Sequence, residues 1–156
     1  MLKKICYAFL LLSLILSLPM ASAKSRPNLD NPKEYVLAWE QGSNFAYLKR
    51  DSVTVDRYDP PEYEVTVSVI YRDREHRSYE PVSETFYYDY GARKMYCRRD
   101  GELIYLPSDS KEEGIPQLRS VGEMTFYLAN NRKFYGKDGG YKKDYYEHAS
   151  TKMHRS

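Results

Sequence analysis

The clearest hydrophobic pattern in the chain is an alternation between residues 62 and 72. Apolar or aromatic side chains occupy every second position: Tyr63, Val65, Val67, Val69 and Tyr71. Polar side chains stand between them, except at Ile70. Because successive side chains of a strand point to opposite faces, this pattern predicts a β-strand with one buried face and one solvent face.

Shorter runs of aromatic and β-branched residues predict further strands on either side. They span residues 35–40, 45–48, 52–58, 82–90, 93–97 and 102–106. Turn-forming residues separate several of them, including Asp59-Pro60-Pro61 and the Asp100-Gly101 step. The long strand and the run at 82–90 are expected to pair antiparallel. We expect about five to six of these segments to form a small antiparallel β-sheet.

One amphipathic helix is expected after the strands. Ser120 and Glu123 have the spacing of a capping box, which predicts that the helix begins at Ser120. The apolar residues that follow fall on one helical face: Val121, Met124 and Leu128. The helix is expected to end near Asn131 and to lie on the sheet. The predicted fold class is α+β, a small sheet with one C-terminal amphipathic helix packed on it.

The first 23 residues have the composition of a cleavable export signal. Two lysines precede an apolar run from Ile5 to Leu18, and the small-residue site Ala21-Ser22-Ala23 follows. Cleavage is predicted between Ala23 and Lys24. The run is shorter than the roughly 20 apolar residues that span a bilayer, so no membrane span is expected in the mature chain. The protein is therefore expected in the periplasm, at the cell surface or outside the cell.

Charge divides the mature chain into two parts. The signal's two lysines account for the formal net charge of +2, so the mature chain is neutral, and binding of polyanions by the whole domain is disfavoured. Residues 132–156 carry seven basic and three acidic residues and almost no aliphatic side chains. We expect residues 24–131 to form one domain and residues 132–156 to form a mobile basic tail.

The tail supplies the candidate binding residues. Lys142 and Lys143 are interleaved with Tyr141, Tyr145 and Tyr146, a mixture that suits anionic polymers. The chain holds 17 tyrosines, which either form contact surfaces or fill the edges of a small core. Nucleic acid is not an expected partner of an exported chain. Host matrix proteins and anionic envelope polymers are the two ligand classes considered.

No motif in the sequence indicates catalysis, a metal or a cofactor. Glycine-rich phosphate loops, serine elbows and paired-cysteine spacings are absent, and His76, His148 and His154 lie too far apart for a local metal motif. Cys97 is the only mature cysteine, so no internal disulfide is expected. It is expected to be a small buried side chain, with a bridge between two chains as the alternative. A pair formed by Cys97 and His76 is the one enzymatic arrangement left open.

Taken together, these features resemble the surface-adhesin protein E family over about residues 35–131. The resemblance rests on Trp39 in the first strand, Tyr47 leading into Asp51-Ser52-Val53, the alternating strand and the Ser120–Glu123 helix start. It implies a small antiparallel sheet with a packed helix, often a homodimer, at or released from a bacterial cell envelope. The adhesin that names the family binds host matrix proteins and haem.

The chain departs from this family at its cysteines. Relatives often carry a cysteine pair that would fall near Tyr90 and Asn130, and neither residue is cysteine here. The family disulfide is therefore not transferred. The leading hypothesis is an exported, non-enzymatic, adhesin-like binding protein of the bacterial envelope. The alternative is a structural or accessory envelope protein that acts through self-association and has no soluble ligand.

Overall fold

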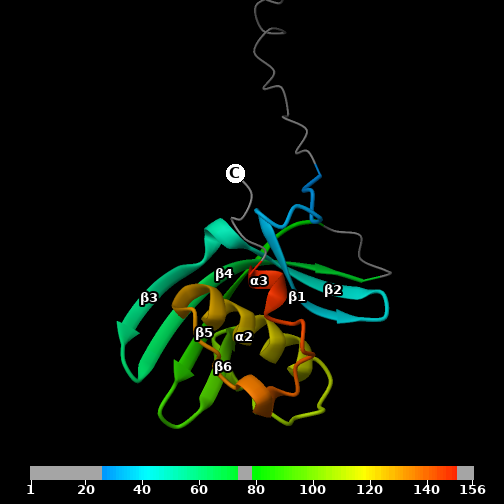
Figure 1. Cartoon of the computed structure of the whole chain (residues 1–156). Helices are drawn as coiled ribbons and strands as arrows, with labels where there is room; N and C mark the ends of the chain where they lie inside the picture. Colours follow the sequence, from blue (N-terminus) through cyan, green and yellow to red (C-terminus); the bar gives the residue numbers. More distant parts are fainter. Residues whose placement is uncertain (1–25, 74–78, 151–156) are drawn as a thin grey trace, which may run out of the picture.

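The structure is a computed structural model that describes residues 26–73 and 79–150 (Figure 1). The predicted export signal, its predicted cleavage site between Ala23 and Lys24, and the histidines at 76 and 154 lie outside the described residues. Seven strands are followed by one long helix. They are β1 (Tyr35–Gln41), β2 (Asn44–Lys49), β3 (Thr54–Asp59), β4 (Glu62–Arg72), β5 (Val82–Asp89), β6 (Lys94–Arg99), β7 (Glu102–Tyr105) and α2 (Ile115–Asn130).

All strand pairs are antiparallel, in the order β1-β2-β4-β5-β6-β7, and β3 also pairs with β4. One edge of β4 is shared, because β2 pairs with residues 69–72 and β3 pairs with residues 62–66. The short 3-10 helix η1 (Arg50–Ser52) joins these two strands. Between these two segments of β4, the Ser68 amide donates a hydrogen bond to the Ser52 hydroxyl oxygen at 2.9 Å. The predicted α+β class and antiparallel sheet are confirmed, with one strand more than the upper expected number.

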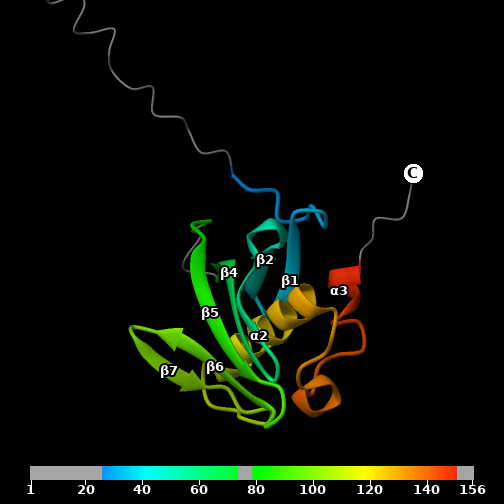
Figure 2. The ribbon, with the colours of Figure 1, turned by 90° about the vertical axis from the view of Figure 1, so that its left-hand side faces the viewer.

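The alternating pattern of β4 places its apolar side chains on one buried face. Val65, Val67 and Val69 are fully buried, and β5 and β6 continue the same face with Phe86 and Met95. Helix α2 lies on this side of the sheet (Figure 2). At Gly122 the helix comes so close that an added Cβ would stand 2.4 Å from Met95 Sδ. The Tyr88 hydroxyl also donates to the Gly122 carbonyl at 2.8 Å.

Helix α2 begins at Ile115, so the predicted start at Ser120 is wrong. Gly114 precedes the helix in the left-handed conformation with φ 80°, and Pro116 occupies the first turn, where no amide partner is needed. Ser120 and Glu123 both lie inside the helix and are buried. The predicted end is confirmed, because Asn131 is left-handed and its amide donates to the Tyr127 carbonyl at 2.8 Å.

The prediction of a mobile tail is wrong for residues 132–150. This segment contains η2 (Gly136–Gly139) and α3 (Glu147–Ser150), and it runs along α2 to the side of β1 (Figure 1). Phe134, Tyr135 and Tyr145 are buried in the common core. The prediction failed because it counted aliphatic residues, whereas here aromatic rings provide the buried apolar area.

The carboxylate of Glu123 fastens this segment to α2. It accepts hydrogen bonds from the amides of Phe134 at 2.9 Å and Tyr135 at 2.8 Å, and from the Tyr146 hydroxyl. Glu123 is fully buried, and a buried carboxylate requires such partners. Within the described residues no helix is long and apolar enough to cross a membrane.

Candidate ligand pocket beside strand β1

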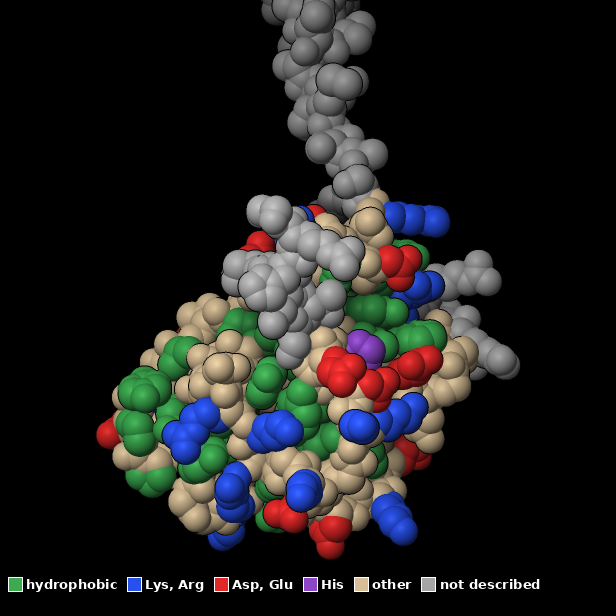
Figure 3. All heavy atoms as spheres, viewed as in Figure 1, with side chains coloured by type: hydrophobic (Ala, Val, Ile, Leu, Met, Phe, Trp, Pro, Cys, Tyr) green, Lys and Arg blue, Asp and Glu red, His purple; other side chains and the backbone are tan. Residues whose placement is uncertain are grey.

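A cavity of about 250 Å³ lies between β1, the first half of α2 and the segment that follows η2. Eight of its lining residues carry aromatic or ionisable side chains: Trp39, Glu40, Arg119, Tyr141, Lys142, Asp144, Tyr145 and His148. On the face that α2 and the C-terminal segment form, acidic side chains gather beside a histidine and basic side chains lie next to them (Figure 3). The pocket therefore combines rings with charges of both signs.

Strand β1 provides one wall of the pocket because it is an edge strand. Its pairing with β2 shifts register between Leu37 and Trp39, which leaves Ala38 without an opposed residue. Such a bulge changes the direction of the side chains beside it. Trp39 is half-buried and lines the cavity.

Two stacked tyrosines form the opposite wall. The rings of Tyr141 and Tyr145 lie 4.5 Å apart between centroids, with 18° between their planes. The Tyr145 hydroxyl donates to the Ser120 carbonyl on α2. Burial raises the pKa of both tyrosines well above the ordinary value, so both hydroxyls stay neutral at physiological pH.

Arginine side chains hold the pocket's elements in place. Arg119 donates from one guanidinium nitrogen to the carbonyls of Pro107 and Ser110, at 3.0 and 3.1 Å, which fixes the connector before α2. Arg50 donates to the carbonyls of His148 and Ala149, at 3.0 and 3.1 Å, which ties α3 to η1.

The structure brings together three of the five predicted binding residues. Tyr141, Lys142 and Tyr145 line the pocket, whereas Lys143 and Tyr146 do not. Lys143 is exposed, and Tyr146 turns toward Glu123 and lies under the Lys133 ammonium group, 4.4 Å from its ring centroid. Sequence reasoning missed Trp39, Arg119 and His148 as pocket residues.

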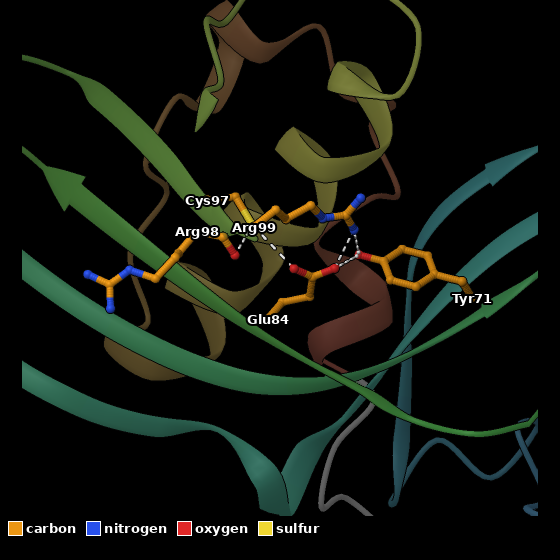
Figure 4. Close-up of polar contacts among 5 residues, drawn as sticks. All are labelled: Tyr71, Glu84, Cys97, Arg98 and Arg99. Carbon is orange, nitrogen blue, oxygen red and sulfur yellow. Dashed lines mark hydrogen bonds and ion pairs between the residues drawn. The ribbon is translucent and has the colours of Figure 1, made fainter. Parts of the chain in front are cut away.

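A second polar cluster lies on the buried face of the sheet, around the Glu84 carboxylate (Figure 4). Glu84 is only 2% exposed. Its carboxylate accepts hydrogen bonds from the Tyr71 hydroxyl at 2.9 Å and from the Cys97 thiol at 3.3 Å, and it forms an ion pair with Arg99. All of its partners come from neighbouring strands, so the cluster connects β4, β5 and β6.

This cluster keeps Cys97 protonated and out of reach. Cys97 is fully buried, and burial, together with the neighbouring Glu84 carboxylate, raises the pKa of its thiol from about 9 to about 12. Only the thiolate is a nucleophile. The expectation of a small buried cysteine is confirmed, and the alternative of a bridge between chains has no accessible sulfur in this fold.

We predict that the folded protein reacts with thiol reagents about a thousandfold more slowly than the unfolded protein at about pH 8, because the thiolate fraction falls with the raised pKa. The measurement is the labelling rate with and without denaturant. Equal rates would show that Cys97 is reactive in the fold.

The chain matches no protein-family model, no curated protein and no solved structure. Residues 26–73 and 79–150 contain no group of three or more His, Cys, Asp or Glu side chains placed to hold a metal ion.

Proposed function

We propose that the protein is an exported, non-enzymatic binding protein of a bacterial envelope, retained there or released, and that the pocket beside β1 holds its ligand. One observation carries the proposal. Trp39 and the pair Tyr141 and Lys142 lie about a hundred residues apart in sequence, yet they line one cavity. The apolar run before Lys24 and the resemblance to the surface-adhesin protein E family support the location.

The pocket's chemistry suits a ligand that joins an anionic group to an apolar or ring-shaped surface. Trp39 and the tyrosines offer large, rigid contact area at low entropic cost. Lys142 is exposed at the rim and offers a mobile ammonium group to an anion. Anionic envelope polymers and acidic segments of host matrix proteins both have this chemistry. In this proposal α2, held on one face of the sheet through Gly122, is the rigid support to which the Tyr145 hydroxyl is hydrogen-bonded at Ser120.

The test is retention of the mature chain, residues 24–156, on anionic envelope polymer and on host matrix protein. We expect Lys142→Glu and Trp39→Ala each to weaken retention about tenfold or more, which corresponds to about 1.4 kcal/mol. Retention should also fall from low to moderate salt, since a rim charge is screened.

The matched control is Lys143→Glu, which makes the same change of charge one residue away but outside the pocket. We expect it to bind within about twofold of the unchanged protein. Equal losses for Lys142→Glu and Lys143→Glu would assign retention to the overall basic charge of the segment. No retention on either material would overturn the proposal.

A further inference from the structure

The sheet has three strands with a free edge, and two of these edges are protected. A free edge presents unpaired amides and carbonyls to other chains, and proteins protect such edges with bulges, charges or covering segments. Strand β3 has a register shift between Val55 and Arg57 and carries Asp56, Arg57 and Asp59. Strand β1 has the bulge at Ala38 and is contacted by α3.

Strand β7 has neither a bulge nor a covering segment, and its protection is limited to its short length and one charged residue, Glu102, beside the turn. Its register with β6 is regular from Glu102 to Tyr105. Leu103 is 55% exposed and Tyr105 45%, which places both among the most exposed large apolar side chains of the described residues. They lie on the sheet face opposite α2, because they pair with Arg98 and Tyr96 rather than with the buried Cys97.

The backbone of β7 shows which groups are free. The turn at Asp100-Gly101, with φ of 51° and 83°, joins Arg99 and Glu102 as the closing pair of a two-residue hairpin. At the other end the Leu106 amide donates to the Met95 carbonyl at 2.8 Å. Because residues of an antiparallel strand turn alternately toward each neighbour, the amides and carbonyls of Leu103 and Tyr105 point away from β6.

We propose that β7 pairs antiparallel with β7 of a second copy, about a two-fold axis at Ile104. In this register Leu103 opposes the second copy's Tyr105, and Tyr105 opposes the second copy's Leu103. The amides and carbonyls of Leu103 and Tyr105 on the two strands then form four hydrogen bonds in total across the axis. The interface is isologous, as in most homodimers.

Self-pairing fits the side chains as well as the backbone. Both opposed pairs join a leucine to a tyrosine, a favourable cross-strand combination. No charged residue faces its own copy, because Glu102 opposes the second copy's Leu106 rather than another carboxylate. Tyr87, Tyr96 and Tyr105 form a row across three strands, with 5.2 Å between the last two ring centroids, and in the dimer this row ends against the second copy's Leu103.

The test is the molar mass of the mature chain in solution, measured by light scattering or sedimentation over a wide range of concentration. We expect a dimer whose dissociation constant rises about tenfold or more in Leu103→Lys and in Tyr105→Lys, because an edge lysine opposes pairing. Both side chains are exposed, and circular dichroism checks that each variant folds.

The matched control is Val55→Lys, which places the same charge at an exposed valine on β3 (41% exposed). It should leave the dimer intact, and so should Lys142→Glu, since the pocket is a separate site. A monomer at every concentration would overturn the proposal. So would a dimer that survives both β7 variants, or one that Val55→Lys weakens equally.

Discussion

A chain that ends at Asn131 is expected not to fold cooperatively. The truncation removes three buried aromatic side chains, Phe134, Tyr135 and Tyr145. It also removes the groups that donate hydrogen bonds to the Glu123 carboxylate, which are the amides of residues 134–136 and the Tyr146 hydroxyl. Loss of one buried phenylalanine alone costs about 3–5 kcal/mol. A domain of this size has a total stability of only about 5–15 kcal/mol. Thermal unfolding followed by circular dichroism should therefore show no sharp transition in the truncated chain.

Point variants separate this effect from a mere change in length. Phe134 is fully buried against Tyr88, Tyr90 and Phe126, so Phe134→Ala should cost about 3–5 kcal/mol. Lys137 is exposed in the same segment, and Lys137→Ala should change stability by less than about 0.5 kcal/mol. A truncated chain with an unchanged transition would show that residues 132–150 are the mobile tail that their composition predicted.

Stability is expected to fall steeply in alkaline solution. Burial raises the pKa of Tyr88 and Tyr145 well above the ordinary value of about 10, and it raises the pKa of Cys97 to about 12. Below these ordinary values both the folded and the unfolded chain are protonated, so stability is complete. As the pH rises past them, the unfolded chain releases its protons first and is favoured.

The decline should begin near pH 9 with the thiol and steepen above about pH 10 with the tyrosines. By about pH 11 Tyr88 and Tyr145 should each contribute a loss on the order of 1 kcal/mol. Denaturant unfolding measured from neutral to strongly alkaline pH gives this profile. Tyr88→Phe should make the decline shallower by one tyrosine's share, whereas Tyr58→Phe should leave it unchanged, because Tyr58 is 69% exposed. A profile that stays flat above pH 10 would contradict this assignment of buried hydroxyls.

The sheet was predictable because strand periodicity acts locally. The alternation in β4 predicted its buried face, and Phe86 and Tyr88 stand on one parity of β5 and are buried with it. Glu84 shares that parity, so its burial was implicit in the same pattern. Its partners on β4 and β6 depend on the register between strands, which the sequence pattern does not determine.

The helix start was mispredicted because two signals competed. Ser120 and Glu123 have the spacing of a capping box, but Gly114 and Pro116 allow the helix to begin earlier. The earlier start is stabilised because it buries the apolar side chains of Ile115 and Leu118. Glu123 then serves another purpose, as the acceptor of two amides from the next segment. Tertiary contacts thus overrode a local motif.

Only half of the pocket was accessible to sequence reasoning. The cluster of tyrosines and lysines near residue 142 was visible as a local pattern. Trp39 and Arg119 carry no local signal that relates them to that cluster, and they meet it only because β1 is at the edge of the sheet and the last segment returns to it.

The central claim is that the pocket beside β1 binds a ligand, and Trp39 reports on it directly. The chain contains one tryptophan, which lines the cavity, so the intrinsic fluorescence excited at tryptophan wavelengths comes from the site itself. We would titrate the mature chain with anionic envelope polymer and with host matrix protein. The account predicts a saturable change in Trp39 emission that Lys142→Glu weakens about tenfold and Lys143→Glu leaves intact. Binding without any change in Trp39 emission would contradict it, because the ligand would then lie elsewhere on the molecule.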